Sequence, residues 1–538
     1  MRTNEFTADS GEALGYLAGV FDGGGLLKNC ASLQPCLVFA CLFSCSLTVA
    51  CGGGRFNDPA GIGAMSIAPS QNPLVAQYTI TTALGCPGQI MVEFGPDTSY
   101  GRTTAWYPAT ATSQTSTILV AGMKASTTYH MRAQAQAQCA GGSTTFSSGD
   151  QIFTTGAIPT ADLLPQFVSS RPASAPNSPA PGVELYSLVS SLPNYLEPVA
   201  TDLQGNVIWY CPVGGIPVKP LPNGHFVSNA GSDWYEIDLA CNIFRDVSTA
   251  QVSQTLQAQG YTYGKLNAFH HDMLALPNGH WILLANIYKA FTDLPGYPGT
   301  TNVLGDVLLD IDPQGNVAWT WNSFDHLDVN RHLQGLPDWT HSNCLVFLED
   351  GNLLLSMRHQ SWILKIDYEN GAGTGDILWK LGEGGDFTLM GGDPSDWFYA
   401  QHYPNVLSTN GSTMTLAVFD NGNLRLNSAL VPCDQNPAAP TCYTRATMFQ
   451  VDESTNVATL MWQYLPNTFS FWGGSIGTLS NGDVEFDMSD PYNTAASLVT
   501  EVTNTDNPQI VWQMNIIGVA AYRGYRLPSL YPGVTWQK

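Results

Sequence analysis

A short motif that recurs six times constrains the fold of this chain more than any other feature. Each copy places turn residues directly before an apolar strand, as in DLQGNVIWY from 202 and DPQGNVAWTW from 312. The remaining copies are DLACNIFRD (238), GTGDILWKL (373), ESTNVATLMWQY (453) and NTDNPQIVWQM (504). A strand unit that repeats in this way, without helical periodicity, is typical of sheets repeated around a common axis.

A second signal alternates with the first. It consists of Asx-Gly turns between apolar runs, which are the strongest short predictors of a β-hairpin. The copies are PLPNGHFV (220), ALPNGHWIL (275), LEDGNLLL (348), LSTNGSTMTL (407) and LSNGDVEF (479). We therefore predict an all-β protein whose residues 183–538 form a six-bladed β-propeller, closed by the segment YRGYRLPSLYP. Residues just before the second signal are then expected at one mouth of the central channel.

The chain before the repeats divides into three predicted segments. Residues 66–156 alternate apolar and polar residues between turns and resemble a fibronectin type III-like β-sandwich. The stretch 157–182 is rich in Pro, Ser and Ala, which predicts a linker. The apolar run LVFACLFSCSLTVA ends at Cys51, so residues 1–51 are expected to be a signal or lipoprotein-type export segment. We expect an exported, periplasmic or cell-surface protein that meets the membrane only through a lipid on Cys51.

The cysteine spacing agrees with export, and the net charge argues against a nucleic-acid partner. Neighbouring cysteines suggest three disulfides, Cys86–Cys139, Cys211–Cys241 and Cys433–Cys442, which leaves Cys344 as a buried, unpaired thiol. The formal net charge is −23, and nucleic-acid binding needs a basic surface. We therefore expect no nucleic-acid partner, and the sequence leaves the oligomeric state open.

Three histidines hold corresponding positions in successive repeats. His271, His341 and His402 precede the Asx residue of their own turn by seven, nine and eight residues. One strand later, Arg358 follows LLLSM. Side chains in register on neighbouring blades should converge on the channel axis, so we predict a functional site there. Because neighbouring strand residues point in opposite directions, we choose His271 over His270 as the channel-facing residue.

Taken together, FHHD…LPNG, DWTHSN, LLLSMRHQSWILKID…GDILWKLG, QHYPNVL and FDNG resemble the bacterial arylsulfate sulfotransferase family, over about 183–538. The resemblance implies an exported propeller enzyme without a cofactor. Such an enzyme moves a sulfuryl group from a phenolic sulfate ester to another phenol through a sulfohistidine. By position, the nucleophile is His402, and its catalytic partners are His271, His341 and Arg358.

The chemistry of sulfuryl transfer suits these residue types. Neutral imidazole is a good nitrogen nucleophile, and an arginine offers hydrogen bonds to the sulfuryl oxygens. The remaining histidines can carry the proton of the leaving or incoming phenol. We also expect side chains near the mouth to bind the substrate. The candidates are Asp272, Trp339, Asn343 and Tyr399.

Two other functions stay open. Three histidines around a propeller axis can hold iron or zinc, but Arg358 beside them disfavours a cation, so we assign no metal. The chain could instead be a non-catalytic exported propeller that binds or scaffolds other molecules.

Overall fold

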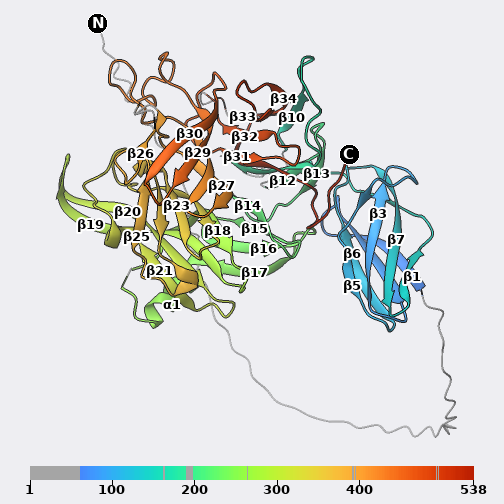
Figure 1. Cartoon of the computed structure of the whole chain (residues 1–538). Coiled ribbons are helices and arrows are strands. Elements are labelled where there is room, and N and C mark those ends of the chain that lie inside the picture. Colours follow the sequence, from blue (N-terminus) through green and yellow to red (C-terminus); the bar gives the residue numbers. More distant parts are fainter. Residues whose placement is uncertain are drawn as a thin grey trace, which may run out of the picture. The chain divides into compact units, whose positions relative to one another are not determined.

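The computed structural model describes residues 61–160, 164–189, 198–262, 264–390, 393, 396–491, 494 and 496–537. The predicted export segment and the lipid on Cys51 lie outside these residues. Strands make up nearly all of the regular structure (Figure 1). The helical elements are short: α1 (Thr249–Ala258), α2 (Ser323–His326), η1 (Arg358–Gln360) and η2 (Glu369–Gly371). No helix in the described part is long and apolar enough to cross a membrane.

Two small antiparallel sheets occupy the region up to Thr154. The first has the order β1-β2-β6, and the second has β4-β3-β7-β8, with β5 on β3 and β9 on β7. The disulfide Cys86–Cys139 joins the start of β3 to the end of β7. The bounds are β1 Gly61–Pro69, β2 Ala76–Ala83, β3 Gly88–Gly95, β4 Arg102–Thr103, β5 Tyr107–Ala109, β6 Gln114–Val120, β7 Thr128–Cys139, β8 Gly142–Ser147 and β9 Gln151–Thr154.

Six further antiparallel sheets follow in the described residues. Two of them have the orders β14-β15-β16-β17 and β18-β19-β20-β21, and a third has β22-β23-β24-β25. The bounds of these twelve strands are β14 Val218–Pro220, β15 Phe226–Asn229, β16 Asp233–Ile237, β17 Ile243–Ser248, β18 Ala268–Ala275, β19 Trp281–Leu294, β20 Tyr297–Ile311, β21 Val317–Asn322, β22 Ser342–Phe347, β23 Leu353–Met357, β24 Trp362–Ile366 and β25 Ile377–Leu381.

The other three sheets complete the set. Their orders are β27-β28-β29-β30 with a parallel β26, β31-β32-β33-β34-β10, and β35-β11-β12-β13. The bounds are β26 Thr388–Leu389, β27 His402–Asn410, β28 Thr413–Asp420, β29 Arg445–Asp452, β30 Val457–Tyr464, β31 Ser475–Thr478, β32 Val484–Ser489, β33 Ala496–Val502, β34 Ile510–Ile517, β10 Gln166–Ser170, β35 Ala520–Leu527, β11 Val183–Val189, β12 Val199–Thr201 and β13 Val207–Tyr210.

Both repeated signals lie where hairpin turns were predicted. Each Asx-Gly signal joins the first and second strands of a sheet, and its glycine has a positive φ, such as +84° at Gly279. Each copy of the first signal joins the third and fourth strands of a sheet. The closing segment forms β35, which pairs with β11 although more than 300 residues separate them. The turns and strands predicted from both signals are confirmed.

Consecutive sheets share their hydrophobic cores. In β23, Leu353 and Leu355 pack with β19 and β20, whereas Leu354 packs on the other side with β28 and β29. A strand buried on both faces must be apolar throughout, which explains the run LLL. Similar clusters lie between the other successive pairs of sheets. The sheet that contains β34 packs on the sheet that contains β11, and the β11 sheet packs in turn on the sheet that contains β14. The cores therefore form a closed circuit.

Two features bear on the earlier predictions. β10 lies inside the stretch predicted to be a linker and pairs with β34, because Phe167 is buried in the core shared with β34. All three predicted disulfides are formed, and Cys344 is buried and unpaired.

Candidate active site

Each of the three predicted histidines lies at or near the start of the first antiparallel strand of its sheet, and the three sheets follow one another along the chain. His271 lies in β18, His341 directly precedes β22, and His402 is the first residue of β27. These strands contact one another in chain order. The ring centres of His271 and His341 are 4.6 Å apart. Tyr522 of the closing strand β35 lies against both His271 and His402, at 5.4 and 6.0 Å between ring centres.

The hydrogen bonds of His402 define its protonation state. Its Nδ1 lies 2.7 Å from Oδ1 of Asn421, whose amide nitrogen donates to the main-chain oxygens of Ser470 and Gly473. Since Oδ1 can only accept, Nδ1 of His402 carries the proton. The amide N–H of Gly473 points at Nε2 from 3.2 Å, which requires a lone pair on that nitrogen. His402 is thus a neutral imidazole with its Nε2 lone pair directed into the site.

Electrostatics favour the same state. His402 is 2% exposed, and burial lowers its pKa well below the ordinary value, with the positive charge of Arg358 as the next cause. Burial also lowers the pKa of His271 well below its ordinary value, followed by the charge of His341. Both imidazoles are therefore neutral at physiological pH.

Arg358 and His359 belong to the 3₁₀ turn η1 rather than to a strand. Nη1 of Arg358 donates to Nε2 of His359 at 2.8 Å, and Nη2 donates to the main-chain oxygen of Phe471 at 3.0 Å. Nδ1 of His359 then carries the proton and donates to the main-chain oxygen of Asp338 at 2.7 Å. Burial, followed by the charge of His341, lowers the pKa of His359 to about 3.

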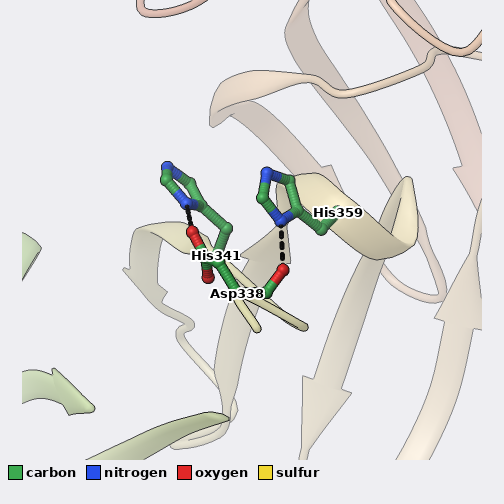
Figure 2. A group of neighbouring side chains, drawn as sticks. All are labelled: Asp338, His341 and His359. Carbon is green, nitrogen blue, oxygen red and sulfur yellow. Dashed lines mark hydrogen bonds and ion pairs between the residues drawn. The ribbon is translucent and has the colours of Figure 1, made fainter. Parts of the chain in front are cut away.

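A carboxylate holds His341. Nδ1 of His341 donates to Oδ2 of Asp338 at 2.5 Å, and the ring of His359 stacks on that of His341 with centres 4.5 Å apart (Figure 2). Burial opposes ionisation of Asp338, but the charge of His341 and the hydrogen bond from it outweigh burial. The pKa of Asp338 is therefore held well below its usual range. His341 has a positive φ of 47°, so the backbone turns sharply as it enters β22.

Asp338, His341 and His359 also form the one cluster of metal-ligating residue types found in the described residues. Their existing bonds do not suit a metal ion. The lone pair of His359 Nε2 accepts from Arg358, and its Nδ1 carries a proton. A guanidinium in direct contact with a ligand would also repel a cation. The donor set fits a hydrogen-bonded relay better than a metal centre.

His270 and His271 do not follow the strand alternation on which the choice of His271 was based. β18 has an irregularity between Phe269 and Met273, and His271 has a positive φ of 57°. Strict alternation therefore fails at this point. Nδ1 of His270 lies 2.7 Å from Nδ1 of His271, and Nε2 of His270 lies 3.2 Å from Oδ1 of Asp306. Both histidines belong to the same network.

The four predicted substrate-binding residues are placed differently from one another. Asp272 is fully buried and accepts from Lys219 and Arg523. Asn343 donates to the main-chain oxygen of Gln401. Trp339 and Tyr399 are buried in hydrophobic clusters that include Leu294 and Val303 for Trp339, and Trp397 and Phe398 for Tyr399.

Several residues of this centre escaped the sequence reasoning. Asn421 lies in FDNG, a motif that contributed to the family resemblance but did not indicate the contact with His402. Asp338 lies three residues before His341, a spacing that a search for carboxylate–histidine pairs finds. Tyr522, which lies against His271 and His402, is in the closing strand β35. The contact of Gly473 with His402 is made by the main chain and leaves no signal in the sequence.

Three comparisons with known proteins bear on this centre. A family model described as Arylsulfotransferase (ASST) matches residues 175–526, about two thirds of the chain. A curated relative named arylsulfate sulfotransferase AssT, from Escherichia coli, is 23% identical over 310 residues. The match spans 46% of this chain and 46% of that protein, so this chain covers about half the length of the relative.

Solved structures resemble the chain only remotely. A Lactobacillus plantarum protein has 10% identity and a TM-score of 0.33, with coverage of 63% of this chain and 82% of its own. Streptogramin B lyase has 10% identity and a TM-score of 0.27, with coverage of 65% and 98%. At these scores neither structure carries an argument about this chain.

Proposed function

The chain belongs to the arylsulfotransferase family, and from that premise we propose that it transfers a sulfuryl group from a phenolic sulfate ester to another phenol. No nucleotide donor or cofactor takes part. The group rests on His402 between the two half-reactions. The observation that carries the proposal is the state of His402, a buried neutral imidazole with its proton on Nδ1 and a lone pair on Nε2.

The first half-reaction begins with attack by Nε2 of His402 on the sulfur of the ester. An N–S bond forms, the S–O bond to the phenol breaks, and the electron pair leaves with the phenol oxygen. Asn421 holds the proton on Nδ1, so attack by Nε2 gives a sulfo-imidazolium ring whose positive charge is balanced by the negative sulfonate group. In the second half-reaction a phenol oxygen attacks sulfur, the N–S bond breaks, and the lone pair returns to Nε2.

Negative charge on the sulfuryl oxygens must be met by donors. Arg358 is 6% exposed and already fixed by His359 and by the main chain of Phe471, so its guanidinium is preorganised. The N–H of Gly473, which points at Nε2 of His402, lies next to the position that the transferred group would take. His271 is neutral and can donate to the same oxygens.

The proton of the phenol needs a carrier, and we assign that role to His341. The Asp338 carboxylate accepts from Nδ1 of His341, which orients the ring and stabilises its protonated form. His341 then gives a proton to the leaving phenol oxygen and later removes one from the incoming phenol. Asp338 acts through His341 and is a positioning residue.

The rest of the molecule fits this account. The closed circuit of six face-packed sheets supports our proposal of a six-bladed propeller over 183–538, with β10 added to its fifth sheet. The two small sheets support a fibronectin type III-like sandwich at 66–156. Three disulfides agree with an exported protein, and we propose a periplasmic or cell-surface location.

An assay with 4-nitrophenyl sulfate tests the proposal. We expect release of nitrophenolate that depends on added phenol and falls by at least about three orders of magnitude in His402→Ala. His225→Ala, which alters a histidine bound to Glu236 in another sheet, should keep full activity. A folded protein that releases nothing with any phenol would favour a binding role. Activity that tracks bound iron or zinc would favour a metalloenzyme.

A further inference from the structure

A cavity lies among strands of the same sheets as the histidine centre. It has a volume of about 380 Å³ and is lined by residues of β14, β27, β31 and β35, including Lys219, Tyr403, Gly524 and Tyr525. The guanidinium of Arg523 lies over the ring of Tyr403 at 4.7 Å and over that of Tyr522 at 5.1 Å. Since Tyr522 contacts His402 and Tyr403 lines the cavity, Arg523 lies between the two sites.

Two cations share one carboxylate at this boundary. Lys219 donates to Oδ1 of Asp272 at 2.7 Å, and Nη2 of Arg523 lies 3.5 Å from Oδ2 of the same residue. The amide N–H groups of Met273 and Leu345 also donate to Asp272, so its oxygens are fully engaged. The three charged groups sum to one positive charge.

The neighbouring titratable groups do not compensate that charge. Burial raises the pKa of Cys344 to about 12, and burial likewise raises the pKa of Tyr403 to about 12, so both are neutral. His271 and His402 are neutral as well. Farther along the cavity wall, Glu485 and Arg526 pair with each other at 2.9 Å.

Some N–H donors of Arg523 make no hydrogen bond within the described residues. Its Nη2 donates to the main-chain oxygen of Asn343 at 2.5 Å. Its Nε and Nη1 are buried and have no hydrogen-bond partner within the described residues. The side chain is 1% exposed. A buried cation with unsatisfied donors is costly unless a counter-ion or water meets it.

We propose that a small inorganic anion binds against Arg523 and Lys219 and enters through the 380 Å³ cavity. Guanidinium and ammonium groups bind oxyanions and halides by the same charge-assisted contacts, so sulfate and chloride are both of the right chemistry. This site is separate from the sulfuryl-binding centre at His402 and Arg358, and the proposal does not rest on the proposed function.

Anomalous diffraction from crystals of the protein soaked in selenate or in bromide tests this proposal. Selenate reports a sulfate-like oxyanion and bromide reports a chloride-like halide. We expect a peak within hydrogen-bonding distance of Arg523 Nε or Nη1, or of Lys219 Nζ, with at least one probe. Calorimetric titration with the same salt should show a loss of affinity of at least about tenfold in Arg523→Gln and in Lys219→Gln.

The control is Lys365→Gln, because Lys365 is a buried lysine whose charge is balanced by Asp350 and Glu453. This variant should bind the anion as the parent does. Lys219→Gln keeps the outcome interpretable if Arg523→Gln fails to fold. A water at Arg523 with no anomalous peak, or a peak confined to His402 and Arg358, would overturn the proposal. A peak only at His402 would leave the proposed transfer reaction intact.

Discussion

At the scale of single residues, the site is defined by which nitrogen of each histidine carries a proton. Asn421 fixes the proton of His402 on Nδ1, the main-chain oxygen of Asp338 fixes that of His359, and the carboxylate of Asp338 fixes that of His341. An imidazole with one proton placed by the protein presents its other nitrogen in a defined state. This arrangement supports the roles that we propose, with His402 as the nucleophile and His341 as the proton carrier.

Asp338→Asn tests the role of the carboxylate. We expect kcat to fall by about two to four orders of magnitude with donors whose phenol is a poor leaving group. The loss should be much smaller with 4-nitrophenyl sulfate, because nitrophenolate leaves without a proton. Since Asp338 is ionised at all but strongly acidic pH in the parent, its loss should move the alkaline limb of the pH profile to lower pH.

The matched control is Asp328→Asn, which alters an exposed carboxylate that accepts hydrogen bonds from Asn330 in the same loop. Its pH profile and its dependence on the leaving group should equal those of the parent. An Asp338→Asn enzyme that loses the same factor with every donor would indicate a purely structural role for Asp338.

At the scale of strands, each sheet is held by side chains on both of its faces. Leu355 in β23 is fully buried, whereas Leu378 in β25 of the same sheet is 50% exposed. Leu355→Ala should lower the free energy of unfolding by about 2–5 kcal/mol, because a buried methyl cluster is replaced by a cavity. Leu378→Ala should change it by less than about 0.5 kcal/mol. Equal effects in denaturant unfolding would contradict a core shared between sheets.

The strands and turns were largely predictable because they depend on local sequence. Glycine at 279, 351 and 411 marks hairpins whose φ is positive, and apolar runs such as LLLSM mark strands buried on both faces. Local irregularity was not predictable. The distortion at His271 and the 3₁₀ turn at Arg358 break strand alternation, and they bring His270 and His359 into the site. Both depend on bonds to distant segments.

At the scale of the whole molecule, buried carboxyl groups divide into two kinds. Those near the site, such as Asp272, meet cations or main-chain donors, so their pKa is lowered despite burial. Asp487 of β32 differs, since both its oxygens are buried without a hydrogen-bond partner in the described residues. The nearby Ser489 hydroxyl donates to the main-chain oxygen of Ala521 instead. Burial and then the charge of Glu184 raise the pKa of Asp487 well above its ordinary value.

Asp487→Asn should therefore stabilise the protein at neutral pH. A carboxyl whose pKa is raised by folding costs stability progressively as pH rises above its unfolded pKa of about 4. We expect the unfolding temperature to rise by a few degrees at pH 7 and the gain to vanish as pH falls towards 4. Asp506→Asn, on an exposed turn, should have no such effect. A variant that melts at or below the parent's temperature at pH 7 would contradict this assignment.

The convergence of the three histidines could be predicted from the repeats, but the partners that set their protonation could be predicted only in part. Register among repeats singled out His271, His341 and His402, and their strands do contact one another. Asn421, the partner of His402, lies directly after another strand, so no periodicity marks it, and Asp338 lies three residues before His341 and outside the repeated motifs. Asp272 was expected to serve the substrate, yet its oxygens are occupied by Lys219 and main-chain donors.

The measurement that tests the central claim most directly is mass spectrometry of the protein after incubation with 4-nitrophenyl sulfate in the absence of any phenol acceptor. The reaction is stopped in alkaline denaturant, because a sulfo-imidazole is labile to acid, and the peptides are then sequenced. We predict a sulfuryl group on His402 that disappears when phenol is added before the stop. An unmodified protein that still transfers sulfate to phenol, or an adduct on His271 or Tyr522 alone, would contradict the account.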